Sequence, residues 1–236
     1  MAIARNRPGW SGDNSAGGAP SRSSQYSDAY LLALGGSKNY GFADEGSYFS
    51  VLNTTPGTGI AGHAAPSSAD PTKPILWLFN GGNLRVSLDL VAVRMTAIGA
   101  GASTTDFSVF VDTGATRVSG GTAMTPRNVN SDSTNESAVT AYIGPTVLVN
   151  ASARHIAHRR VRSVVPVVED QYVFSFGYGG YGLPAGVATS GTNIAAIHVS
   201  FPAVSIGPGD SLIFVEWGAS QSGAHSFDFE VGYVER

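Results

Sequence analysis

Apolar and polar residues alternate along much of this chain with a period of two. The clearest example is residues 226–235, where four large apolar side chains alternate with small or polar ones: Phe227, Phe229, Val231 and Tyr233. Successive side chains of a β-strand point to opposite faces of its sheet, so this pattern is typical of a strand with one buried face. We therefore predict a strand over these residues.

A second alternating run changes phase near Leu90. Its apolar residues are even-numbered over residues 84–90 and odd-numbered over residues 91–95. A β-bulge near Leu90 would shift the pattern by one position, and a strand covered on both faces would also produce it. The sequence predicts a strand here and leaves these two alternatives open.

Further strand-like runs follow one another, separated by clusters rich in Gly, Asn, Asp and Pro. The runs cover residues 75–79, 107–111, 138–149, 172–176, 193–201 and 211–217. About eight to ten strands joined in this way, without a repeat of fixed length, are typical of a sandwich or barrel rather than a propeller. We predict an all-β fold, an antiparallel β-sandwich of the jelly-roll type.

A helix is predicted only at residues 28–34, where Ser27 can cap the first turn and Gly35 and Gly36 follow the last. Residues 1–24 are rich in Gly, Ser and Pro and offer almost nothing apolar to bury, so they cannot offset their own ordering entropy. We predict an extended N-terminal arm over residues 1–46 and one β-sandwich domain over residues 47–236.

Four side chains distinguish the arm from a plain linker: Arg5, Arg7, Trp10 and Arg22. Interface hot spots are enriched in Trp and Arg. We predict that these residues bind a partner protein, the alternative being a tail that binds nothing.

The composition limits the classes of partner. Charged residues make up 13% of the chain, against about 25% in a typical domain, which favours a surface largely covered by other proteins. The net charge of −3 gives no reason to expect binding to nucleic acid or to an anionic membrane. The apolar runs are too short to span a bilayer, and residues 1–10 lack the apolar core of a secretory signal. We expect synthesis in a cytoplasm, and the absence of cysteine excludes disulfides.

The richest cationic cluster lies in residues 154–162 and contains four arginines and two histidines: Arg154, Arg159, Arg160, Arg162, His155 and His158. On a regular strand His155 and Arg159 face one way, and His158, Arg160 and Arg162 face the other. The histidines then diverge, which argues against a metal site. Glu169 and Asp170, or carboxylates of a neighbouring chain, can pair with the arginines. We predict an intersubunit contact, with a solvated strand as the alternative.

Three motifs match functional signatures only in part. Ser211 stands in a Gly-Asp-Ser-Leu sequence, which is the signature of a family of hydrolases whose serine attacks esters. The Asp-x-x-His that these enzymes also need does not follow it. The glycines of residues 177–182 have dinucleotide-loop spacing without a following helix. Residues 128–136 space oxygen ligands as a calcium loop does, without its central glycine. We predict a turn, an exposed loop and a polar loop, and no catalytic, cofactor-binding or metal-binding residues.

Aromatic residues occupy alternate positions from Tyr172 onwards. Phe174 and Phe176 are predicted to be core, because aromatic residues in strands usually are. Tyr178 and Tyr181 lie among glycines and are predicted to be surface contacts, either with another subunit or with a sugar.

Several segments resemble virion structural proteins of tailed bacteriophages. They are residues 72–80 (Thr-Lys-Pro-Ile-Leu-Trp-Leu-Phe-Asn), 84–96, 111–114 (Val-Asp-Thr-Gly) and 119–128. The body after residue 46 is similar to the jelly-roll proteins that decorate or cement phage capsids. The resemblance implies a non-enzymatic virion protein that binds the major capsid protein or another virion protein as a homo-oligomer, in particular a trimer. The alternative is a receptor- or glycan-binding module of a tail or spike.

Overall fold

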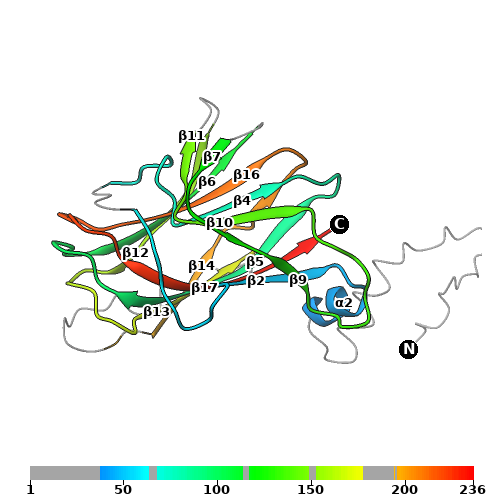
Figure 1. Ribbon diagram of the computed structural model, residues 1–236, viewed down its shortest axis with the longest axis horizontal. Coiled ribbons are helices and arrows are strands. Elements are labelled where there is room, and N and C mark those ends of the chain that lie inside the picture. Colours follow the sequence, from blue (N-terminus) through cyan, green and yellow to red (C-terminus); the bar gives the residue numbers. More distant parts are fainter. Residues whose placement is uncertain (1–37, 64–67, 114–116, 149–152, 178–193, 195) are drawn as a thin grey trace, which may run out of the picture.

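The structure of the protein is a computed structural model that describes residues 38–63, 68–113, 117–148, 153–177, 194 and 196–236. These residues form one helix, α2 (Lys38–Asp44), and the strands β2 to β17. The predicted helix at residues 28–34 and most of the predicted arm lie outside the described residues. Helix α2 lies within that arm and was not predicted; it packs beside the start of β2 (Figure 1).

The strands form two large sheets that lie face to face (Figure 1). One sheet has six strands in the order β12 (Arg154–Arg162), β6 (Thr105–Asp112), β16 (Ser211–Trp217), β4 (Leu76–Asn80), β10 (Val139–Ile143) and β8 (Thr122–Met124). All of its pairings are antiparallel.

The other sheet contains eight strands. Its main path is β14 (Ala196–Phe201), β13 (Gln171–Phe176), β5 (Val86–Ala97), β17 (Ser226–Glu235), β2 (Tyr48–Leu52) and β9 (Pro126–Asn128). Two short strands complete it, β15 (Ser205–Ile206) beside β5 and β3 (Ile60–Ala61) beside β17. Only β13 and β14 pair in parallel among these strands. A separate hairpin pairs β7 (Arg117–Ser119) with β11 (Thr146–Leu148).

The connectivity of eight of these strands is that of a jelly roll. In chain order they are β2, β4, β5, β6, β12, β13, β16 and β17, and they pair from the outside of the sequence inward. β2 pairs with β17, β4 with β16, β5 with β13 and β6 with β12, each pair antiparallel. Two interleaved Greek keys give this arrangement. The predicted all-β antiparallel sandwich is confirmed.

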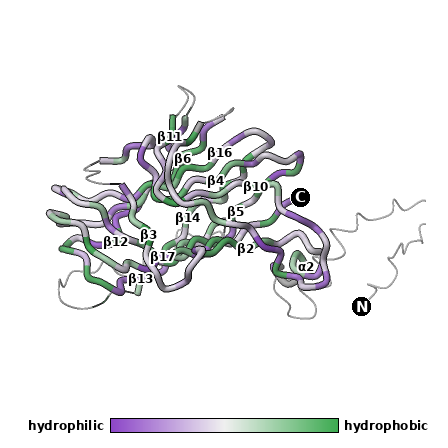
Figure 2. Tube along the Cα trace, in the orientation of Figure 1, coloured by the Kyte–Doolittle hydropathy of each residue, from purple (hydrophilic) through white to green (hydrophobic). Residues whose placement is uncertain are grey.

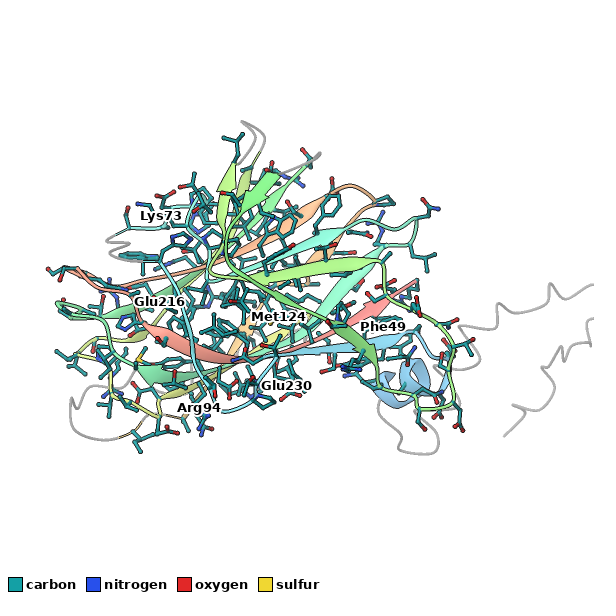
Figure 3. All side chains as sticks on the ribbon, viewed as in Figure 1. Phe49, Lys73, Arg94, Met124, Glu216 and Glu230 are labelled. Carbon is teal, nitrogen blue, oxygen red and sulfur yellow. The ribbon has the colours of Figure 1, made fainter. Side chains whose placement is uncertain are left out.

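The core fills the space between the two sheets with aromatic rings. The Phe107 ring centroid lies 4.8 Å from that of Phe174 and 5.5 Å from that of Phe214. Phe174 also stacks on Phe201, at 5.3 Å. The strands of both sheets contain many hydrophobic residues (Figure 2), and Met124 lies between the sheets (Figure 3). The prediction that Phe174 and Phe176 are core residues is confirmed.

The phase change in β5 is a β-bulge. Leu90 lies opposite Gly232 and Leu88 lies opposite Tyr233, so Asp89 has no directly opposite residue in β17. The extra residue turns the Asp89 carboxylate towards the start of the domain, where it accepts hydrogen bonds from Asn39 Nδ2 (2.7 Å) and Tyr48 Oη (2.8 Å). Of the two alternatives, the bulge is the correct one.

The last residue of the chain lies beside the first described helix. The backbone of Arg236 exchanges two hydrogen bonds with Arg85, each 3.0 Å long. Its guanidinium carbon lies 4.7 Å from the centroid of the Phe42 ring in α2. The C-terminal end of β17 and the start of the domain therefore lie at the same end of the sandwich.

Candidate functional site

The cationic cluster lies on β12, the edge strand of the six-stranded sheet, and two register shifts change which way its side chains point. His155 lies opposite Phe110 and Ala157 opposite Val109, which leaves Ile156 without an opposite residue, and a second shift follows Arg160. The prediction that His155 shares a face with Arg159 is therefore wrong. His155, His158 and Arg160 share the outer face, because a bulge reverses the alternation.

Arg162 also departs from the predicted arrangement. It is wholly buried, after the second register shift, and does not continue the outer face that carries Arg160. Arg162 donates to Asp170 Oδ1 at 3.0 Å and to the Val165 carbonyl at 2.9 Å. Tyr172 Oη donates to the other Asp170 oxygen at 3.0 Å. The predicted pairing with Asp170 is confirmed, and it joins β12 to the loop before β13.

The other arginines of the cluster have different surroundings. Arg159 points to the core side, with its guanidinium carbon 5.6 Å from the centroid of the Phe201 ring. Arg160 Nε donates to Asp106 at 3.0 and 3.2 Å. Arg154 is exposed at the start of the strand. Glu169, the second carboxylate predicted for this cluster, pairs with Arg94 instead.

The outer side of β12 and its neighbours carries a band of stacked rings and cations. We call the surface formed by His155, His158, Arg160 and Trp217 the β12 face, and the ring of Phe110 is buried beside His155. The ring centroids of Phe110 and His155 lie 4.4 Å apart, and those of His158 and Trp217 lie 5.7 Å apart. Flat, rigid rings beside an arginine are the composition of protein interfaces. The predicted role of Arg160 in partner binding belongs to this surface and remains a prediction.

Ser108, His158 and Asp106 lie under this face in the order of a nucleophilic triad. Ser108 Oγ is 3.1 Å from His158 Nδ1, and His158 Nε2 is 3.3 Å from Asp106 Oδ1. Burial lowers the pKa of His158. The charge of Asp106 acts against this shift, whereas His155, Arg160 and Arg159 lower the pKa further. However, Ser108 and Asp106 have no exposed surface and Arg160 occupies the Asp106 carboxylate. A substrate carbonyl cannot reach Ser108, so the three groups serve the packing of β6 against β12.

The cluster of Asp106, Ser108 and His158 was not predicted, although the sequence contains a signal for it. The apolar set Phe107, Val109 and Val111 predicts a strand with one face in the core. Asp106 and Ser108 occupy the alternate positions, which place them on the outer face opposite Arg160 and His158. An aspartate in a predicted strand, together with an arginine-rich strand elsewhere in the chain, is the pattern that indicates the ion pair between Asp106 and Arg160.

The outer face of the eight-stranded sheet carries a shallow groove of about 300 Å³. Arg94 lies in it between two carboxylates, 3.1 Å from Glu169 and 3.1 Å from Asp228. Figure 3 shows Arg94 and Glu230 on this outward side of the sheet. A neighbouring hollow of about 330 Å³ shares the side chains of Leu52, Asn53 and Pro56 with the groove. The groove's only aromatic lining residue among those described is Phe229, which is 3% exposed.

A buried acid and a buried base meet at the end of the sandwich that holds the β16–β17 loop. The Gly99 amide donates to His225 Nδ1 at 2.9 Å, so the ring proton is on Nε2, 3.5 Å from Glu216 Oε1. Burial raises the pKa of Glu216 well above its ordinary value, against a hydrogen bond from Gln221. Burial lowers the pKa of His225 to about 4. His225 is therefore neutral at pH 7, and burial favours the neutral form of Glu216.

Two of the three motifs predicted to be turns or loops have those roles, and the third, the glycine loop at residues 177–182, lies outside the described residues after Gly177. Ser211 is wholly buried in β16, and Gly209 before it has a φ of 80° in a turn closed by the Asp210 amide on the Gly207 carbonyl, at 3.1 Å. In the loop at residues 128–135, Asn128 and Asn135 donate to the Gly46 carbonyl at 2.9 and 3.1 Å. Their side chains thus hold backbone rather than a cation.

Six residues predicted to bind partners lie outside the described part of the chain: Arg5, Arg7, Trp10, Arg22, Tyr178 and Tyr181. Within the described ranges, no group of three or more His, Asp or Glu side chains is placed to hold a metal ion. The one described helix is too short to cross a membrane. Comparison with protein-family models, curated proteins and solved structures finds no match to this chain.

Proposed function

We propose that this chain is a structural virion protein that decorates or cements the capsid of a tailed phage. The observation that carries the proposal is the jelly-roll strand pairing, β2 with β17 through β6 with β12. Viral capsid proteins, lectins and cupins share this architecture. Because one fold serves unrelated functions, the surface residues of the protein are needed to distinguish these classes.

The interior and the groove favour a structural role over small-ligand binding. Phe107, Phe174 and Phe214 pack against one another between the sheets, where an internal ligand would need space. A sugar site usually offers an exposed ring, and the one described ring that lines the groove is buried. The β12 face, in contrast, has stacked rings beside Arg160, as protein interfaces do.

A cement protein stabilises a shell because several modest contacts act together. Each contact of an oligomer raises the effective concentration of the next, so the total binding exceeds that of any one interface. In this proposal the sandwich sits on the capsid surface, and the arm with Arg5, Arg7 and Trp10 extends over neighbouring capsid subunits. The partner is the major capsid protein, and the protein acts as a homo-oligomer without a cofactor.

Deletion of residues 1–25 tests the proposal. We expect the shortened protein to lose binding to purified capsids stripped of this protein while its thermal unfolding temperature stays unchanged. The substitutions Arg5→Ala, Arg7→Ala and Trp10→Ala in the full chain should weaken the same binding, with Asp132→Ala as the control. Undiminished binding of the shortened protein would sink the proposal. Glycan-array binding that Tyr181→Ala removes would favour the receptor-binding alternative.

A further inference from the structure

One long side of the sandwich is closed by a single segment of chain. Residues 122–128 supply the edge strand β8 to one sheet and then the edge strand β9 to the other. Each strand has three residues, and β9 begins with Pro126. Short strands and proline are common devices that prevent another chain from pairing with a sheet edge. This side is therefore a poor place for strand addition.

On the opposite side, the edge strand β12 is protected in another way. Its two register shifts interrupt the row of backbone groups that a further strand would need. Its arginines would also meet one another if a second copy of the same strand paired with it, because like charges directly opposite are unfavourable. The arginine-rich sequence of β12 thus disfavours pairing of this strand with β12 of a second copy.

The edge strand β14, on the same side but in the other sheet, has none of these features. All six of its residues pair with β13 in one uninterrupted register. The strand contains no charged residue and no proline. Ile197, Val199 and Phe201 are buried on the core side, whereas Ala196 and His198 are exposed on the other. Among the described strands, β14 has a neighbour on one side only, which leaves a regular template for strand pairing.

We propose that β14 pairs antiparallel with β14 of a second copy of this chain, about a twofold axis at His198. In that register Ala196 lies opposite Ser200 of the other copy, and Ile197 lies opposite Val199. Opposite residues share a face of the sheet, so the apolar residues stay on the core side and the polar residues stay outside. No opposite pair contains Asp, Glu, Lys or Arg. The two eight-stranded sheets then continue across the axis as one.

A twofold contact of this kind is closed, so it gives a dimer rather than a fibre. Five paired residues per copy make a small contact, well below the ~1,200–2,000 Å² of a standard interface, and we expect the free dimer to be weak. If copies are held side by side on a common surface, a larger fraction of them is expected to be dimeric, because tethering raises their effective concentration. The inference does not depend on the virion role, and its test uses the isolated protein.

Cysteine cross-linking tests the register directly, because the chain has no cysteine of its own. Directly opposite residues of antiparallel strands have Cα atoms ~4.5–5.5 Å apart, within the ~4.4–6.8 Å that a disulfide spans. His198→Cys should therefore form a covalent dimer under mild oxidation. Ala196→Cys alone should not, whereas a mixture of Ala196→Cys and Ser200→Cys chains should. The control is Thr140→Cys, which is exposed on β10 of the other sheet.

Sedimentation of the uncross-linked protein gives a second readout. We expect a concentration-dependent dimer that the double variant Ala196→Lys, Ser200→Lys weakens at least tenfold, with Thr140→Lys as the control. Thermal unfolding of each variant shows that the fold is intact. A protein that stays monomeric, a dimer that tolerates both lysines, or His198→Cys cross-linking no faster than Thr140→Cys would overturn the proposal. Cross-linking of His198→Cys to a cysteine placed in residues 1–37 would show that the arm, rather than a second copy, pairs with β14.

Discussion

At the scale of single residues, burial decides what a charged side chain does in this protein. Arg162 and Arg154 are only eight positions apart in one cationic cluster, yet Arg162 has no exposed surface and Arg154 is at the protein surface. An arginine taken out of water requires a carboxylate with matching geometry, which Asp170 supplies at 3.0 Å. The cluster therefore divides into a structural part and a surface part, which sequence alone does not separate.

Removing the partner of Arg162 should be costly. Asp170→Asn keeps the size of the side chain but leaves the buried guanidinium uncompensated, so we expect a loss of about 3 to 5 kcal/mol of unfolding free energy. Urea unfolding measures this loss. Glu136→Gln, which removes an exposed carboxylate, is the matched control and should change stability little. A loss below about 1 kcal/mol for Asp170→Asn would contradict the structural role assigned to the pair.

His225 should make the protein sensitive to acid. Its pKa is about 4 in the folded protein, against an ordinary value of 6.5, so the unfolded chain takes up the proton first as the pH falls. The stability due to neutral His225 is complete above pH 6.5 and is lost as the pH falls towards 4, by roughly 3 kcal/mol in total.

The variant His225→Asn isolates this effect. Its side-chain oxygen can still accept the Gly99 amide, but it does not titrate. Glu216, whose raised pKa acts in the opposite direction, is present in both proteins. We expect the wild type to lose more unfolding free energy than the variant between pH 7 and pH 4, measured by urea unfolding. Parallel curves for the two proteins would contradict the assignment.

At the scale of elements, the two bulged strands differ in how far sequence reveals them. In β5 the large residues change from even to odd positions at Leu90, so the extra residue leaves a visible trace. In β12 both faces carry long polar side chains, so a shift of one position leaves the pattern unchanged. The alternating pattern predicts that strands are present, but it does not predict which face of the sheet carries His155. β2 escaped prediction because its five residues mix Ser and Tyr with two buried apolar residues.

The β5 bulge should hold α2 on the sheet. Asp89 accepts hydrogen bonds from Asn39 in the helix and from Tyr48 at the start of β2. Asp89→Ala removes both, and hydrogen bonds to a charged acceptor are each worth about 1.5 kcal/mol or more, so we expect a loss of about 3 kcal/mol. Hydrogen exchange should show faster opening of α2 with the central strands still protected. Asp132→Ala is the control, and equal protection of α2 in both proteins would contradict this role.

At the scale of the whole molecule, the fold is one long hairpin rolled up so that distant segments meet. β17 is a central strand of its sheet and pairs with β5 on one side and β2 on the other. The sandwich class followed from the number and spacing of strand-like runs. The pairing order did not, because alternation tells which residues face the core and not which strands are neighbours.

Loss of the last strand should therefore prevent folding. A chain without residues 226–236 exposes the edges of both β5 and β2 and removes Phe227, Phe229 and Tyr233 from the core. We expect no cooperative thermal transition by circular dichroism. A chain without residues 1–37 is the control and should unfold as cooperatively as the full protein. A cooperative transition in the first variant would show that the sandwich closes without its central strand.

The contact of Arg236 with Phe42 has a consequence for protein engineering. Because the two ends of the described domain are neighbours, a short Gly-Ser linker can join residue 236 to residue 38, with new termini opened at the Gly81–Gly82 turn. Such a circular permutant keeps every strand pairing of the jelly roll and loses only the covalent connection between β4 and β5 at that turn. Residues 1–37 can then be attached at a new position, which separates the contribution of the arm's sequence from that of its point of attachment.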